Sequence, residues 1–154
     1  MKISTRKDIA AQPADVFAKL ADFPAHEAQA RGADVDVSRL DDGSAPARAA
    51  WRVAFDYRGR RRRADMAVVT FDPDQQLAIR GTMDGLMALG NVELMDLGDK
   101  GTRVFASVDL KPSTMTARIL IQSLKLARGA LERRLSRRLD RLAVKVERKP
   151  AANG

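Results

Sequence analysis

The sequence predicts an α+β fold in which an antiparallel sheet of about six or seven strands packs against a long C-terminal helix. Segments of alternating apolar and polar residues, separated by short turn sequences, fill the stretch from residue 50 to residue 110. This pattern is typical of consecutive hairpins. After Pro112 the apolar residues instead recur at helical spacing. A sheet with one apolar face and a helix with one apolar stripe bury these surfaces against each other.

The first third of the chain predicts one strand followed by two short helices. Residues 1–11 alternate loosely and lack a helix cap, so they form a strand with Ile3 and Ile9 on one side. Pro13 stands at the first position of a helix, where its missing N–H costs nothing. A second short helix is ended by Gly32. A short strand follows.

The arginine-rich segment AAWRVAFDYRGRRRRADMAVVTFD predicts two strands joined by a turn at residues 58–59. With this turn, Arg52 lies opposite Asp65 and Asp56 lies opposite Arg61. Opposite charges on facing positions stabilise a strand pair, and two such pairs in one register support that register. The arginine run is therefore mainly the polar tip of a hairpin, which discourages pairing with other sheets.

The following segments predict further hairpins. In a regular strand that places Met66 on the inner face, Phe71 would point to the outer face. We therefore expect a bulge near Val69, which shifts the alternation by one residue. The Asp-Gly dipeptide at 84–85 is the strongest short hairpin signal in the chain and places Met83 opposite Leu86. A last alternating strand then runs up to the C-terminal helix.

The C-terminal helix is expected to run from a cap at Ser113 or Thr114 to about Glu147, a length of roughly 50 Å if it is unbroken. Arg138 falls within its apolar stripe, and a gentle drift of the stripe would place it at the edge. With no linker or repeat in the chain, we expect one domain over residues 1–149 and a loose tail at 150–154. The stripe consists of Leu120, Leu124, Ala127, Leu131, Leu135, Leu139, Leu142 and Val146.

The net charge of +8 is confined to the C-terminal segment. Residues 1–112 carry 17 basic and 17 acidic side chains, whereas residues 113–154 carry 11 and 3. The absence of cysteine excludes disulfides and thiolate metal sites. The charged start does not fit a signal peptide, and no apolar run reaches about 18 residues. We therefore expect a cytoplasmic protein without a transmembrane segment.

Several segments resemble a known family. They are QPADVFAKLADF after the first strand, WRVAFDYRG, TFDPDQQLAIR, GDKGTRVFASVDL and the closing helix. With these, nearly the whole chain resembles the SRPBCC or START-like superfamily of helix-grip domains, which includes lipid-transfer domains, coenzyme Q-binding proteins and bacterial polyketide cyclase-like proteins. The resemblance implies a curved antiparallel sheet that wraps around the long helix, with a cavity between them that the two short helices close. These segments are more specific for fold than for function.

The residues that common catalytic and metal sites need are missing. His26 is the only histidine, and no G-x-S-x-G motif supplies a nucleophilic serine. A lone histidine on a short helix is most often a surface or helix-terminal residue. His26 and Glu27 are adjacent in sequence and lie on different helix faces, so they do not form a zinc site. We predict no catalytic residue, no metal site and no cofactor.

The side chains that converge on the inside of the sheet are the candidate ligand-binding residues. Gly81, Ala88, Gly90 and Ala106 leave space on this face, and methionine suits an adaptable lining. Alternatively, the apolar side chains simply pack together. Arg62 could bind a carboxylate or phosphate at the pocket mouth, or it could extend into water. The candidates are Trp51, Phe55, Arg62, Met66, Met83, Val92, Val104, Val108, Leu124 and Leu131.

Three classes of function remain open. The favoured one is binding or transport of a small hydrophobic or lipid-like molecule, which needs no catalytic residue. The second is an enzyme of the polyketide cyclase or dehydratase kind, in which Tyr57 and Arg62 would handle protons. The third is electrostatic binding of the basic C-terminal helix to RNA, the ribosome or an anionic membrane. Aromatic residues form only 5% of the chain and do not alternate with the arginines, which argues against specific recognition of nucleic acid.

Overall fold

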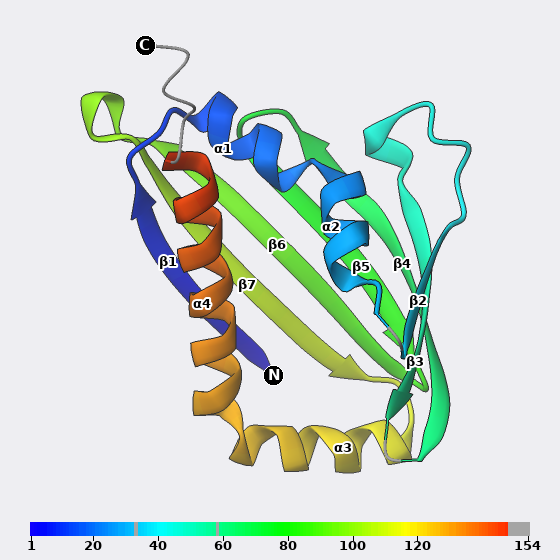
Figure 1. The fold of residues 1–154 in the computed structure, drawn as a ribbon. Coiled ribbons are helices and arrows are strands. Elements are labelled where there is room, and N and C mark those ends of the chain that lie inside the picture. The colour runs from blue at the N-terminus through cyan, green and yellow to red at the C-terminus, as the bar shows by residue number, and fades with distance from the viewer. Residues whose placement is uncertain (33, 58, 148–154) are drawn as a thin grey trace.

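The computed structural model describes residues 1–32, 34–57 and 59–147, so the predicted tail at 150–154 lies outside the described residues. One curved seven-stranded antiparallel sheet carries helices against its concave face (Figure 1). This confirms the predicted helix-grip fold class. The strands are β1 (Lys2–Ile9), β2 (Val35–Arg39), β3 (Ala50–Tyr57), β4 (Arg60–Asp72), β5 (Gln76–Met83), β6 (Leu86–Asp96) and β7 (Thr102–Pro112). The helices are α1 (Pro13–Leu20), α2 (Phe23–Ala30), α3 (Met115–Leu126) and α4 (Arg128–Glu147).

The strands follow one another in space almost as they do in sequence. The order is β1-β7-β6-β5-β4-β3-β2, so only β1 and β7 are neighbours that are distant along the chain. Lys2 pairs with Asp109 at one end of this contact, and Ile9 pairs with Thr102 at the other. The main chain of Met1 extends the pairing, because its carbonyl oxygen accepts a hydrogen bond of 2.7 Å from Leu110 N.

The predicted register of the arginine-rich hairpin is confirmed. Arg52 lies opposite Asp65 and Asp56 lies opposite Arg61. Arg52 Nε donates to Asp65 Oδ1 at 2.8 Å, and Arg61 pairs with Asp56 at 3.4 Å. The cross-strand charge pairs therefore stabilise the same pairing of β3 with β4 that they predicted.

The bulge and the second turn also lie where they were expected. The register between β4 and β5 shifts between Val68 and Thr70, and the extra residue lets Phe71 contact the concave side. Asp84 and Gly85 both have positive φ, 48° and 80°. This conformation matches the twist of a two-residue hairpin, and glycine adopts it without steric cost.

The expectation of one continuous C-terminal helix is wrong, because the helix breaks at Ala127. Figure 1 shows α3 crossing one end of the sheet and α4 turning away from it to run across the concave face. Ala127 N donates to Leu124 O at 3.0 Å, a tightened last turn, and Gly129 follows with low helix propensity. Arg128 Nη1 donates to Lys2 O at 2.7 Å and fixes the junction to β1. Ala127, assigned to the buried stripe, is exposed.

The core lies at the end of the sheet that α1, α2 and the last turns of α4 cover. One cluster joins β1, β7, α1 and α4 around Ile9, Val16 and Val104, each 0% exposed. A second cluster joins α1 and α2 to β3 and β5 around Trp51 and Phe23, whose rings meet edge-on with centroids 4.9 Å apart. We call this region the packed end.

Candidate functional site

The part of the concave face nearest to α3 and to the β3–β4 and β5–β6 turns, which can be located in Figure 1, carries apolar side chains that are only half-buried. Its side chains are half-buried and belong to neither core cluster. A concave apolar surface that water still reaches can bind an apolar ligand without displacing core side chains. We call this set the open end: Phe55, Met83, Ala88, Val108, Leu110, Leu120, Leu124 and Leu131.

The candidate ligand-binding residues divide between the two ends. Trp51 and Val104 lie inside the core, with 6% and 0% of their surface exposed. Met66 and Val92 are half-buried and pack against the core clusters. The remaining apolar candidates belong to the open end: Phe55, Met83, Val108, Leu124 and Leu131.

Arg62 connects two hairpin tips. Its Nη1 donates to Asp84 Oδ2 at 2.9 Å, and its Nε donates to the carbonyl oxygen of Tyr57 at 3.3 Å. The guanidinium also lies 5.7 Å from the centroid of the Tyr57 ring, within range of a cation–π interaction. The charge of Arg62 is already paired within the protein, which makes it less available to an anionic ligand.

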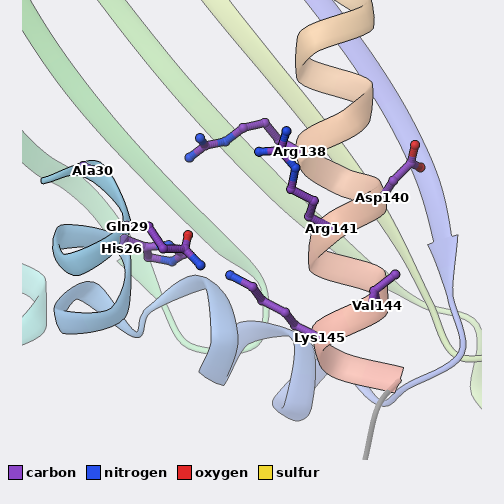
Figure 2. A pocket seen from close by; sticks show the side chains of 8 residues that line it. All are labelled: His26, Gln29, Ala30, Arg138, Asp140, Arg141, Val144 and Lys145. Carbon is purple, nitrogen blue, oxygen red and sulfur yellow. The ribbon is translucent and has the colours of Figure 1, made fainter. Parts of the chain in front are cut away.

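An open groove of about 620 Å³ lies between α2 and α4. Figure 2 shows Arg138 and Arg141 extending from α4 toward α2, from which His26 and Gln29 point back, with strands of the sheet behind them. A smaller neighbouring groove continues toward Lys19 and Asp22 at the end of α1. The lining residues of the larger groove are His26, Gln29, Ala30, Arg138, Asp140, Arg141, Val144 and Lys145.

The groove is positively charged. Asp140 is the acidic residue of its lining, and its Oδ1 pairs with Lys7 Nζ of β1 at 3.0 Å. Within the ranges that the structure describes, Arg138, Arg141 and Lys145 form no ion pair with the protein. Arg138, which the sequence places at the edge of the apolar stripe, is exposed as expected. These cations can therefore bind a carboxylate or a phosphate without breaking an existing contact.

His26 holds the two short helices together at the rim of this groove. Its Nε2 lies 3.0 Å from Leu20 O and 3.1 Å from Lys19 O, at the C-terminal end of α1. Carbonyl oxygens only accept hydrogen bonds, so Nε2 carries the proton. The ring thus adds a hydrogen bond at the C-terminal end of α1, where Lys19 O also accepts from Asp22 N at 3.4 Å. His26 itself lies in the middle of α2, so only its ring, and not its own position in the chain, is helix-terminal.

Glu27 is the residue that the sequence analysis missed. Its carboxylate is 11% exposed. Its Oε2 accepts from Trp51 Nε1 at 3.0 Å and from Arg39 Nη1 at 3.1 Å, while the Arg39 guanidinium lies 5.4 Å from the Trp51 ring centroid. The contact joins α2 to β2 and β3 and fixes the helix that forms one wall of the groove. A glutamate on a short helix gives no local signal for this contact, because the contact depends on the tertiary fold.

Asp41 completes this network. Arg39 donates to it through Nε at 2.7 Å and Nη2 at 2.8 Å, and the main-chain N–H groups of Ala50 and Gly43 add two further hydrogen bonds. The Arg39 hydrogen bonds hold the pKa of the Asp41 carboxyl well below its ordinary value. The same contact raises the pKa of Arg39. Asp41 and Arg39 therefore stay charged throughout the physiological pH range.

Two general properties of the described residues bear on the site. No group of three or more His, Asp or Glu side chains among residues 1–32, 34–57 and 59–147 is placed to hold a metal ion. None of the helices described is both long and apolar enough to cross a membrane.

Known proteins similar to this chain support its fold. The profile of the family described as "Polyketide cyclase / dehydrase and lipid transport" matches residues 1–147. A protein of Thermus thermophilus has a similar structure, with a TM-score of 0.68 at 17% identity over 95% of this chain and 97% of its own. The Zhui aromatase/cyclase of Streptomyces sp. R1128 gives 0.69 at 17% identity, covering 100% and 98%.

A START superfamily protein of Mycobacterium smegmatis gives a TM-score of 0.54 at 17% identity, covering 88% of this chain and 97% of its own. A search of curated proteins found no match. At such low identity the structural similarities show the fold alone.

Proposed function

The chain belongs to the polyketide cyclase / dehydrase and lipid transport family, and we propose that it binds a small apolar molecule with an anionic end. The apolar part would contact the open end of the concave face. The anionic end would bind to the cations of the groove between α2 and α4. The observation that carries the proposal is that the concave side of the sheet holds both a half-buried apolar surface and Arg138, Arg141 and Lys145, which form no ion pair among the described residues.

The free energies expected of apolar burial and of arginine–carboxylate pairing support a site with one apolar and one cationic part. A methylene group that leaves water for an apolar surface contributes about 0.8 kcal/mol, so about ten buried methylene groups would supply the roughly 8 kcal/mol of micromolar binding before the cost of association is subtracted. A guanidinium binds a carboxylate through two parallel hydrogen bonds, which adds orientation as well as affinity. The groove volume of about 620 Å³ lies within the range of small-molecule sites.

A pair of matched ligands tests the proposal. Dodecanoate and dodecanol share a hydrocarbon chain and differ in charge. We expect the protein to bind dodecanoate at least about tenfold more tightly, because only the carboxylate pairs with arginine. The measurement is displacement of a fluorescent apolar probe, supported by native mass spectrometry of the purified protein for a co-purified molecule.

Variants locate the two parts of the site. Replacing both Arg138→Gln and Arg141→Gln is expected to remove the preference for dodecanoate and leave dodecanol binding unchanged. The matched control, Arg134→Gln with Arg137→Gln, removes the same charge from exposed positions of α4 outside the groove. Equal affinity for the two ligands, or an equal effect of the control, would contradict the assigned groove. Binding of neither ligand would contradict the proposed function.

The alternative is an enzyme of the cyclase kind, favoured by the structural similarity to the Zhui aromatase/cyclase. In this chain Tyr57 and Arg62 are in contact and lie beside Phe55 of the open end. A reactive chain bound there would meet a phenol oriented by a guanidinium. The test is turnover of a poly-β-ketone substrate, which must collapse in both Tyr57→Phe and Arg62→Gln for this alternative to stand.

A further inference from the structure

Helix α3 is apolar on two opposite faces. Ala117 and Ile121 face the sheet and are 1% and 5% exposed. Met115, Ile119 and Leu126 are 70%, 64% and 92% exposed. With 3.6 residues per turn these three side chains fall within an arc of about 40°, on the side away from the buried face. We call them the outer stripe. Three large apolar side chains in a row that are exposed to solvent are unusual for a helix that already has a buried face.

The charges around the outer stripe have one sign. Helix α3 contains Arg118 and Lys125 and no acidic residue, and Lys111 precedes it. Among the described residues, neither Arg118 nor Lys125 forms an ion pair. The helix therefore presents an apolar strip bordered by free positive charge, the pattern of a helix that lies in the interface of an anionic membrane.

The protein holds the outer stripe in place at both ends of α3. Thr114 Oγ1 accepts from Ala117 N at 3.1 Å, which caps the helix, and Ser113 Oγ donates to Gly85 O at 2.8 Å. At the other end Arg128 Nη1 donates to Lys2 O at 2.7 Å. The orientation of the stripe is thus set by the sheet, so the helix presents this face to solvent without having to fold on binding.

We propose that α3 docks on the surface of an anionic phospholipid membrane, with the outer stripe among the acyl chains and the cations on the lipid phosphates. A second copy of the chain fits less well. Three side chains cover much less area than the roughly 800 Å² that each partner contributes to a stable interface, and a symmetric contact would bring like charges together. This inference does not depend on the ligand proposed above, because the stripe lies on the face of α3 opposite to its buried side.

Vesicle flotation of the full chain tests the docking. We expect binding to vesicles of phosphatidylglycerol and phosphatidylcholine and little binding to phosphatidylcholine alone. The variant Met115→Ser, Ile119→Ser, Leu126→Ser should lose at least about tenfold in affinity, because it removes the apolar contacts. The matched control is Leu40→Ser, Val69→Ser, Met95→Ser, which replaces apolar side chains outside α3 that are 49%, 46% and 47% exposed, and it should leave the affinity unchanged. Circular dichroism confirms that each variant is folded.

The cations are tested separately. Arg118→Gln and Lys125→Gln should each weaken binding to the anionic vesicles about fivefold, since one basic residue near such a surface contributes about that factor. Equal binding to both kinds of vesicle, an equal loss in the control variant, or no binding at all would overturn the proposal. So would a dimer in native mass spectrometry that the three serines dissociate, or RNA binding that the same serines abolish.

Discussion

The packed end and the open end are parts of one concave face and differ in what covers them. Val104 and Val108 show this most directly, because they stand four residues apart on β7 and face the same side. Val104 is 0% exposed, whereas Val108 is half-buried. Both come from the same alternating pattern. The pattern decides which side of the sheet a residue faces, and the position of the helices decides whether that side becomes core or surface.

The break at Ala127 produces the difference. A straight helix over the whole stripe would cover the concave face along its length. Because α3 turns to cross the end of the sheet, only α4 runs over the face, and its buried residues are those of its last turns, Leu139, Leu142, Ala143 and Val146. The buried side chains of α4 are therefore concentrated at one end of the concave face, and the side chains at the other end are left half-buried.

The largest expected effect tests this division directly. Val104→Ala should destabilise the protein by about 2 to 3 kcal/mol, because it leaves a cavity in a rigid core. Val108→Ala removes the same atoms from the open end and should cost less than about 1 kcal/mol. Urea unfolding followed by circular dichroism measures both. Equal losses would mean that the two ends are packed alike.

The second prediction concerns the network that fixes α2. Glu27→Ala leaves the Trp51 indole N–H and Arg39 without their acceptor, so we expect a loss of about 2 kcal/mol. Trp51 is the only tryptophan, and its fluorescence should shift as its surroundings change. Glu93→Ala, at an exposed carboxylate on β6, is the control and should change neither property measurably.

The third prediction concerns a variant that fills the open end without altering the core. Ala88→Leu adds volume to the inner face of β6 and should weaken dodecanoate binding about tenfold. Its effect on unfolding should stay below about 1 kcal/mol, because the site is half-buried. Ala54→Leu adds the same volume on the outer face of β3 and serves as control. Tighter binding by Ala88→Leu would place the ligand elsewhere.

The smallest expected effect is an acid dependence of stability. The pKa values of Asp8, Asp41 and Asp65 lie below their ordinary value, in each case mainly because an arginine hydrogen-bonds to the carboxylate. A carboxyl group with a lower pKa in the folded state adds stability above its ordinary pKa of about 3.9, and this stability is lost as the pH falls below it. Urea midpoints should be level from about pH 7 to 5 and decline below about 4. Asp41→Asn should flatten the decline.

Features that depend on neighbouring sequence were predictable. The turn sequences predicted the pairing of Tyr57 with Arg60 and of Met83 with Leu86, and the side of the strand on which Phe71 falls predicted the bulge. The break at Ala127 was hidden, because leucines continue through it at helical spacing and the only local sign is Gly129. The pairing of Arg62 was hidden as well, since its partner Asp84 lies in the next hairpin. Contacts between elements depend on curvature, which residue spacing does not encode.

The pairing of β1 with β7 implies an order of folding. Strands β2 to β7 each pair with the next strand along the chain, so each pair can form from the turn that joins its two strands. Strand β1 must instead close a loop of roughly a hundred residues to reach its partner β7. During synthesis on the ribosome β1 emerges before the other strands and cannot pair until β7 has emerged. Before this pair forms, the exposed edge of β7 and the apolar side chains of β1 remain open to pairing with other chains, which makes this interval the stage most prone to aggregation.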